Sequence, residues 1–201
     1  LRLHAFVMVG YPQIVKGNPG KYYNSICFVG RNGDLIETYQ KTHLFMTDEN
    51  WAEEGPGFKS INVPELGKVG FGICMDLNSY KYQTPFTTFE FARFHLRQQS
   101  DIILCSMAWL SGGNPVDYWC QRLLPLYNDT YVNDEDLQNL DATRNRNILF
   151  VASNRTGFEN GSTFCGNSCV ISISPQKQIR PLRLLNDHEE TVMVVDVSHL
   201  L

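Results

Sequence analysis

The sequence has no apolar run that approaches the roughly 20 residues needed to cross a bilayer, and its first residues do not form a charged segment followed by an apolar one. It also has no excess of basic residues. Seventeen Lys and Arg side chains are dispersed against 21 Asp and Glu side chains, which gives a net charge of -4 and a pI near 5.7. Nucleic acids and acidic membranes bind basic patches, so we expect neither as a partner.

The cysteines lack the paired short spacings of a zinc site. There are six, at positions 27, 74, 105, 120, 165 and 169, and the close pair Cys165 and Cys169 has neither a second pair nor a histidine nearby. Four of the six lie in apolar, strand-like segments. This pattern is typical of reduced, buried thiols, so we expect no metal, no disulfide and a cytoplasmic or nuclear location.

One cysteine stands at the end of a hydrophobic strand, in Val69 to Leu77, VGFGICMDL. Cys74 lies where a nucleophile would be exposed, but a free thiol has a pKa of roughly 8.5 and needs help to ionise. Gly70 and Gly72 permit a close approach of backbone or substrate, and the N–H of Met75 would be an oxyanion donor. The alternative is that Cys74 is one more buried cysteine in an apolar strand.

A lysine lies at the end of another strand, in Tyr39 to Phe45, YQKTHLF. Lys41 is the helper that we expect for Cys74, because a nearby cation favours the thiolate. The five histidines offer no Cys/His catalytic pairing. His43 is therefore interpreted as a structural neighbour of Lys41 and not as a base.

Together these motifs resemble the nitrilase, or carbon–nitrogen hydrolase, superfamily, whose catalytic triad is Glu, Lys and Cys. Lys41 and Cys74 match two of its three members. The continuation Asn78 to Phe94, NSYKYQTPFTTFEFARF, is similar to the fungal protein N-terminal amidase branch, and Leu149 to Ser168 is similar to the late strand and loop of the superfamily. The resemblance covers nearly the whole chain and implies one carbon–nitrogen hydrolase domain over residues 1–201.

The resemblance implies a segment that this sequence does not contain. In the family the catalytic glutamate lies on an early strand end, after one further strand and helix, and there is no room for these before His4 to Tyr11. The first residue is Leu1 and not methionine. We therefore expect an N-terminally incomplete domain that lacks the general-base glutamate and is inactive alone, and we assign no Glu of this sequence to that role.

Many family members carry a second glutamate between the lysine and the cysteine. In Thr47 to Phe58, TDENWAEEGPGF, the resemblance points to Glu49, which would hold Lys41 or the attacking water. The alternative is an exposed helix end, capped by Asp48 or by the threonine that precedes it.

The implied activity is hydrolysis of a carboxamide through a Cys74 thioester, with no metal or organic cofactor and with Lys41 and the Met75 N–H on the oxyanion. The amidase branch implies that the substrate is a peptide or protein beginning with Asn or Gln, deamidated to Asp or Glu in N-degron processing. Asp76 is the expected counter-charge for its α-amino group, and Trp109 the expected pocket wall. The alternatives are that Asp76 caps the following turn and that Trp109 is ordinary core or rim packing.

Two other functions stay open at this point. A small-molecule ω-amidase or carbamoyl-amide hydrolase would keep Lys41 and Cys74, but would need a basic residue for a distal carboxylate. A non-catalytic, nitrilase-like binding protein is favoured if the shortened start is natural. Because nitrilase relatives commonly pair through their sandwiches, the resemblance also implies a homodimer.

The order of elements predicts an α/β fold. Apolar residues at helical spacing predict a helix over Phe86 to Gln98, between two buried strands, and this order implies a parallel crossover. The resemblance adds the four-layer α-β-β-α sandwich, without its first strand, helix and glutamate-bearing strand end. Further predicted elements are a helix over Leu137 to Asn147 and strands over His4 to Gly10, Tyr22 to Val29, Leu35 to Gln40, Lys68 to Ile73, Asp101 to Ser106, Ile148 to Ser153, Ser168 to Ser174 and Thr191 to Val197.

Overall fold

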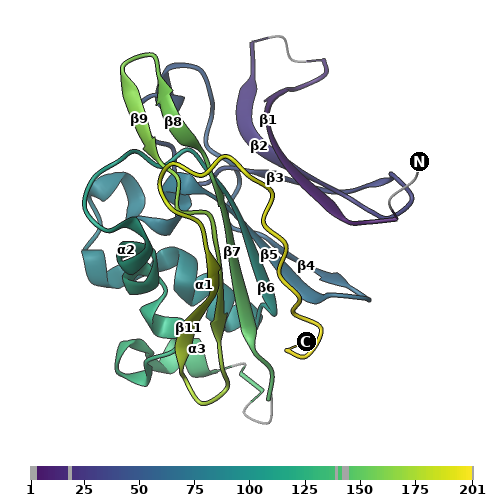
Figure 1. Cartoon of the computed structure of the whole chain (residues 1–201), viewed down its shortest axis with the longest axis vertical. Coiled ribbons are helices and arrows are strands. Elements are labelled where there is room, and N and C mark those ends of the chain that lie inside the picture. The colour runs from purple at the N-terminus through teal and green to yellow at the C-terminus, as the bar shows by residue number, and fades with distance from the viewer. Residues whose placement is uncertain (1–3, 18–19, 139, 142–144, 201) are drawn as a thin grey trace.

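Two β-sheets of different size pack against each other in the computed structural model, which describes residues 4–17, 20–138, 140–141 and 145–200 (Figure 1). The smaller sheet is an antiparallel meander of β1 (Val7–Ile14), β2 (Tyr22–Val29) and β3 (Leu35–Gln40). Gly33, with a φ of 88°, lies in the turn between β2 and β3, as the Asn-Gly sequence predicts. The second and third predicted strands are confirmed at both ends, and Lys41 follows the last residue of β3.

The larger sheet has six strands in the order β11-β10-β7-β6-β5-β4. Its centre, β5-β6-β7, is parallel and its two flanks are antiparallel, so the predicted parallel crossover is confirmed. A separate hairpin joins β8 to β9. The strands are β4 (Ser60–Val63), β5 (Gly67–Ile73), β6 (Ile102–Met107), β7 (Ile148–Asn154), β8 (Thr156–Glu159), β9 (Ser162–Cys165), β10 (Cys169–Ile173) and β11 (Ile179–Leu184).

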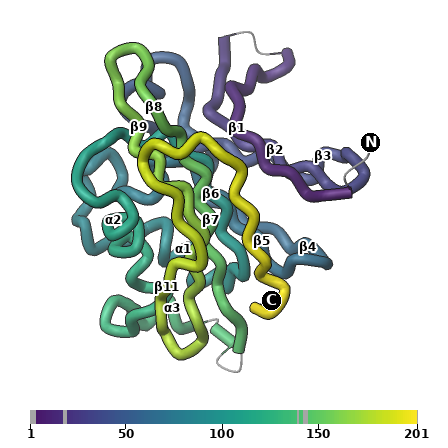
Figure 2. Tube along the Cα trace, viewed as in Figure 1, coloured from purple at the N-terminus to yellow at the C-terminus, as the bar shows by residue number. Residues whose placement is uncertain are grey.

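The helices cover one face of the larger sheet (Figures 1 and 2). The longest is α1 (Glu90–Gln98), which connects β5 to β6 and buries Phe91, Ala92 and Leu96. The others are α2 (Pro115–Arg122), α3 (Asp134–Leu137) and the 3-10 turns η1 (Asp48–Asn50), η2 (Cys74–Leu77), η3 (Tyr80–Tyr82), η4 (Phe86–Thr88), η5 (Leu124–Leu126) and η6 (Asp129–Tyr131).

Two apolar cores separate the layers. One lies between the helices and the larger sheet and includes Phe91, Trp119 and Phe150. The other lies between the two sheets and includes Phe28 and Phe71. The mixed α/β fold is therefore confirmed, and the described residues supply three of the four implied layers, because no described helix covers the outer face of β1-β2-β3 (Figure 1).

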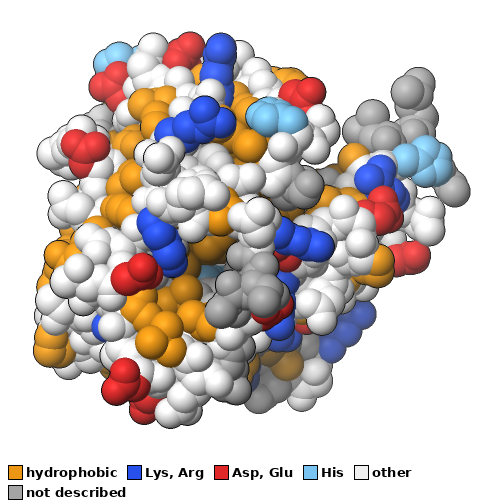
Figure 3. All heavy atoms as spheres, turned by 90° about the horizontal axis from the view of Figure 1, so that it is seen from below, with side chains coloured by type: hydrophobic (Ala, Val, Ile, Leu, Met, Phe, Trp, Pro, Cys, Tyr) orange, Lys and Arg blue, Asp and Glu red, His pale blue; other side chains and the backbone are white. Residues whose placement is uncertain are grey.

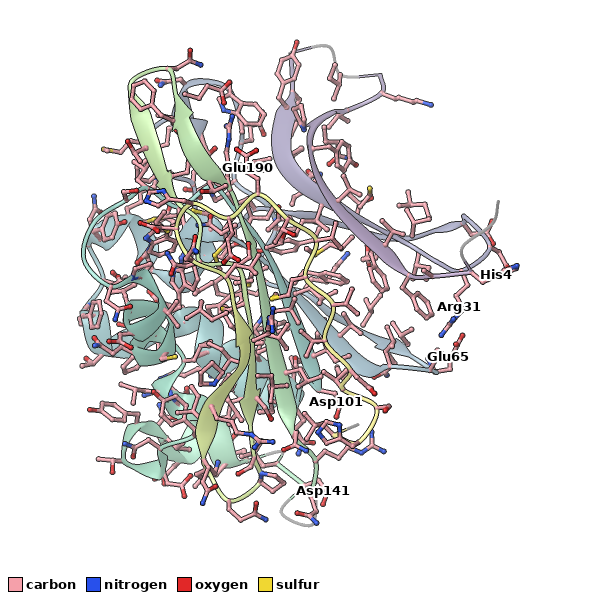
Figure 4. The ribbon with its side chains drawn as sticks, viewed as in Figure 1. His4, Arg31, Glu65, Asp101, Asp141 and Glu190 are labelled. Carbon is pink, nitrogen blue, oxygen red and sulfur yellow. The ribbon has the colours of Figure 1, made fainter. Side chains whose placement is uncertain are left out.

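Close contacts fix the smaller sheet to the larger one. Gly10 of β1 lies so near β6 that an added Cβ would be 2.8 Å from the Ser106 hydroxyl oxygen. At the far end, the Arg31 guanidinium pairs with the Glu65 carboxylate at 2.6 Å and also donates to the main-chain oxygen of His4 (Figure 4). These contacts fix the position of the smaller sheet relative to the larger one, and the loop that follows β3 moves with its sheet.

Two predicted elements are wrong. The predicted helix Leu137–Asn147 is not formed, because α3 ends at Leu137. Residues 138, 140–141 and 145–147 are not helical, and positions 139 and 142–144 lie outside the described residues. Thr191–Val197 is not assigned to a strand and pairs with no described strand (Figure 2). Val192 and Val194 are each 86% exposed. Alternating apolar residues favour a strand, but a strand needs a partner edge for its backbone groups.

On one face of the molecule, charged side chains of both signs are interspersed (Figure 3). On the face seen in Figure 3, Lys and Arg side chains lie at several separate places among acidic and uncharged ones. Across the described ranges, no helix has both the length and the apolar character that a bilayer span requires. In the same part of the chain, no cluster of three or more His, Cys, Asp or Glu side chains is suited to a metal ion.

Candidate active site

The candidate site lies where the parallel strands of the larger sheet end. The carboxyl ends of parallel strands meet at one edge, and Cys74 and Ala108 are the residues that follow β5 and β6 there. Cys74 has a φ of 43°, in the left-handed region, which costs roughly 1–2 kcal/mol for a residue with a Cβ. The surrounding hydrogen bonds must hold this turn in place.

Asp76 is the group that holds the turn. Its carboxylate accepts hydrogen bonds from the N–H of Ile73 at 2.8 Å, from the N–H groups of Thr42 and His43 at 3.0 and 2.8 Å, and from the Tyr39 hydroxyl at 2.7 Å. It is fully buried, and burial raises the pKa of Asp76 while these hydrogen bonds oppose the rise. The carboxylate thus ties the turn after β5 to the loop after β3.

The structure does not place Asp76 at the mouth of the pocket, where the sequence analysis expects it. It lines none of the three cavities around Cys74 described below. The geometry matches the alternative, in which Asp76 caps the turn, because its carboxylate bonds the N–H of Ile73 at the start of η2. Four protein donors already bind this carboxylate, so its acceptor sites are occupied.

Lys41 is buried beside Cys74 and is paired with Asp48. Its ammonium is 2.5 Å from the Asp48 carboxylate, and the two side chains are 3% and 10% exposed. Asp48 also accepts hydrogen bonds from the N–H of Phe45 at 2.9 Å and the amide of Asn24 at 3.1 Å. Lys41, Asp48 and Cys74 line one cavity of about 490 Å³, which we call the lysine cavity.

The structure does not bring Glu49 to Lys41. Its carboxylate lies 3.5 Å from the ammonium of Lys81, and its side chain is 45% exposed. Consecutive side chains of a 3-10 turn point about 120° apart, because the turn has roughly three residues. In η1 it is therefore Asp48 that faces inward, and it takes the contact with Lys41 that the sequence analysis assigned to Glu49.

Burial decides the protonation of the cysteine. Removal from water raises the pKa of the Cys74 thiol to about 11, although the positive charge of Lys41 and a hydrogen bond from the backbone of Ala108 act in the opposite direction. At neutral pH the thiol is therefore protonated, and nucleophilic attack needs a proton acceptor. Among the described residues that line the lysine cavity, the one carboxylate is that of Asp48, which Lys41 already binds.

A second cavity, of about 210 Å³, is also lined by Cys74 and is called the inner cavity. It brings together Cys74, Met75 and Trp109, three of the residues that the sequence analysis proposed. Asn78 and Tyr82 also line it. These two residues and Trp109 also line a third, larger space of about 490 Å³, the outer cavity, so that the inner and outer cavities adjoin.

Among the described residues that line the outer cavity, one has a carboxylate side chain. This is Asp117 in the first turn of α2, whose carboxylate accepts a hydrogen bond from the amide of Asn114 at 2.7 Å. Neither the inner nor the outer cavity is lined by a described Lys or Arg. The combined space is therefore acidic at its outer end and largely apolar beside the thiol.

The sequence motifs do not single out Asp48, Asn78 or Asp117. Asp48 fits a helix cap and also follows Lys41 closely enough for a pair, but the sequence contains nothing that distinguishes it from Glu49. Asn78 lies four residues after Cys74, within the stretch already singled out. Asp117 is far from both motifs in sequence, and only the packing of α2 brings it to the site.

Comparison with known proteins finds one matching family and several named relatives. The family profile described as carbon-nitrogen hydrolase matches residues 2–125. A protein N-terminal amidase of Schizosaccharomyces pombe is 32% identical over 198 residues, covering 87% of this chain and 64% of its own length. A second protein of that name, from Saccharomyces cerevisiae, is 35% identical over 134 residues, covering 58% of this chain and 29% of its own. The chain thus spans less than two thirds of these relatives.

Solved structures show the same fold. A crystal structure of an N-terminal amidase has a TM-score of 0.77 and is 20% identical, and the match covers 92% of this chain and 76% of that one. An N-terminal amidase with an Asn-Glu-Ala peptide matches equally well.

Proposed function

Because the chain belongs to the carbon–nitrogen hydrolase family, we propose that it carries the nucleophile and oxyanion site of an amidase that releases ammonia from an N-terminal Asn or Gln side chain. The observation that carries this proposal is the position of Cys74. It lies at the junction of the lysine cavity and an inner cavity that opens into an acidic outer one.

The proposed chemistry begins with proton loss from the Cys74 thiol. The sulfur attacks the carboxamide carbon, and the oxygen becomes a tetrahedral oxyanion next to the Lys41 ammonium and the Met75 N–H. The C–N bond then breaks, and the amide nitrogen takes up a proton and leaves as ammonia. Water attacks the resulting thioester, which releases a carboxylic acid and returns the thiol.

Asp48 has a positioning role in this proposal, and it replaces Glu49 there. A buried ammonium needs a counter-charge, and the 2.5 Å contact fixes the direction of the Lys41 side chain. The described residues of the two cavities that contain Cys74 do not offer an unpaired carboxylate to accept the thiol proton. We therefore propose the activity for the full-length protein.

The form of the cavities supports a peptide N-terminus as the substrate. The inner cavity, about 210 Å³, has room for a carboxamide side chain, and the outer cavity takes the main chain that follows. A free α-amino group is positively charged, which suits the Asp117 carboxylate. The names of the relatives and the Asn-Glu-Ala peptide in one neighbouring structure agree with this choice.

A small-molecule ω-amidase is less well supported. Its substrate would carry a distal carboxylate that needs a cation, and no described Lys or Arg lines the inner or outer cavity. A purely binding function does not explain why a buried ammonium and a thiol on a left-handed turn line the same cavity. The cytoplasmic or nuclear location and the homodimer stay predictions.

Mass spectrometry of two peptides tests the proposal. The full-length protein is incubated with an Asn-initiated peptide and with its N-acetylated twin. We expect the free-amine peptide to be converted to the Asp form faster than its acetylated twin, because acetylation removes the charge that Asp117 would bind. Equal conversion of both peptides would contradict recognition of the amine, and conversion of neither would contradict the proposed activity.

A further inference from the structure

Asn78 lies at the junction between the inner and outer cavities and is 2% exposed. It follows the last residue of η2, four residues after Cys74. Its N–H donates to the main-chain oxygen of Met75 at 2.9 Å, and its own main-chain oxygen lies 2.9 Å from Nδ1 of His43. The backbone of Asn78 is thus fixed from two sides.

The side-chain amide of Asn78 is fixed at one end and open at the other. Its Oδ1 accepts a hydrogen bond from the Tyr118 hydroxyl at 2.5 Å, which sets the orientation of the amide group. Its Nδ2 contacts the sulfur of Met75 at 3.3 Å and has no other partner in the described part of the chain. An amide nitrogen has two N–H donors and a thioether is a weak acceptor, so one buried donor remains unused.

An unused donor in a buried site costs about 1–3 kcal/mol unless a ligand or water satisfies it. At the junction, a ligand whose carboxamide reaches Cys74 would place its main chain next to Asn78. A peptide that begins with Asn or Gln has a hydrogen-bond acceptor in this part of its chain, the main-chain oxygen of its first residue. A small amide with no carbonyl or carboxylate on the carbon that bears the amine has none.

We propose that Asn78 is a specificity-determining residue, which donates a hydrogen bond from Nδ2 to the main-chain carbonyl oxygen of the first substrate residue. This inference rests on the proposed function and deepens it. Asn78 thereby distinguishes a peptide N-terminus from a small amide without this carbonyl. The contacts with Tyr118 and with the Met75 sulfur together orient the amide group, so neither contact alone decides its direction. A merely structural role would be different: the bond to Tyr118 would tie η2 to α2 and affect all substrates alike.

The test compares two substrates of the full-length protein. Asn-Ala-amide has the first main-chain carbonyl, whereas 3-aminobutanamide has the same amine and carboxamide without it. We expect Asn78→Leu to lower the ratio of kcat/KM for the peptide to that for the small amide about five-fold, the effect of one neutral hydrogen bond. Tyr118→Phe, which breaks the tie to α2 but keeps the donor, is expected to retain at least half of the wild-type ratio.

An equal loss for both substrates in Asn78→Leu would overturn the inference and leave the proposed function standing. If the wild-type protein converts neither substrate, the proposed function fails and this inference fails with it. If Asn78→Leu does not fold, the hydrogen bond can be tested by changing the substrate in place of the protein. In the wild type, a peptide whose first main-chain carbonyl is a thiocarbonyl, a weaker acceptor, is expected to react several-fold more slowly than its oxygen counterpart, and equal rates would also overturn the inference.

Discussion

At the scale of single residues, the sequence motifs predict Cys74 and Lys41 as a pair, and the structure places them in one cavity. The partner of Lys41 could not be predicted in the same way. Asp48 and Glu49 are adjacent carboxylates in one 3-10 turn, and the turn points them in different directions. Asp48 is held inward by the side-chain amide of Asn24, which belongs to β2. Side-chain direction within a short turn depends on tertiary contacts that a local motif does not contain.

The pH dependence of Cys74 reactivity follows from its burial. Because burial raises the pKa of the thiol to about 11, the thiolate fraction rises roughly ten-fold per pH unit below that value. We expect the rate of Cys74 alkylation by iodoacetamide, mapped by peptide mass spectrometry, to rise steadily from pH 7 to about pH 10. Lys41→Met removes the nearby positive charge and should slow the reaction further at each pH. A rate that levels off near neutral pH would show an ionised thiol and contradict this expectation.

A pair of matched variants distinguishes the role of Asp48 from that of Glu49. Asp48→Asn leaves the buried Lys41 ammonium without a counter-charge, and we expect unfolding free energy to fall by about 3 kcal/mol and kcat/KM to fall at least ten-fold. Glu49→Gln alters an exposed contact and should leave both close to wild type. Urea unfolding and peptide deamidation measure the two effects. The reverse order of effects would restore Glu49 as the partner of Lys41.

The acidic outer cavity gives a prediction for the substrate amine. Asp117→Asn keeps the shape of the side chain and its contact with Asn114 but removes the charge. We expect KM for an Asn-initiated peptide to rise about three-fold with little change in kcat, the effect of one solvent-exposed ion pair. Asp134→Asn, at a carboxylate that lines neither the inner nor the outer cavity, is the control. An unchanged KM in Asp117→Asn would remove Asp117 from the binding of the amine.

At the scale of elements, the sequence predicts best the two strands that form a local hairpin, β2 and β3. Tyr22–Val29 and Leu35–Gln40 are confirmed at both ends, because alternation and an Asn-Gly turn specify a hairpin locally. The short edge strand β4 and the hairpin β8–β9 were missed, since four residues carry little periodicity. Thr191–Val197 has a strand pattern but no partner edge in the described residues, and pairing is not a local property.

The close packing of α1 on β5 depends on glycine. A Cβ at Gly72 would lie 2.8 Å from the ring of Phe91 and 2.9 Å from the sulfur of Cys105, closer than packed atoms allow. We expect Gly72→Ala to lower the unfolding free energy by about 1–3 kcal/mol, measured by urea denaturation. Lys68→Ala, in the same strand but half-buried, is the matched control and should cost less. Equal stability of wild type and Gly72→Ala would show that the helix can move away without penalty.

At the scale of the whole molecule, two sheets and one layer of helices bring distant segments to one edge. Lys41 comes from the end of the smaller sheet, Cys74 from the larger one, and Tyr118 and Asp117 from a helix of the outer layer. The layers follow from periodicity and from the resemblance, but the position of α2 over the site follows from packing alone. The match to one N-terminal amidase relative covers 64% of that relative's length.

The central claim is that Cys74 forms a thioester with the substrate. It is tested most directly by acid-quenching the full-length protein during turnover of an Asn-initiated peptide and mapping the adduct by mass spectrometry. We predict an adduct on Cys74 with the mass of the peptide minus ammonia, and no adduct or deamidation in Cys74→Ala. Deamidation by Cys74→Ala, or an adduct on another residue, would contradict the assignment of the site.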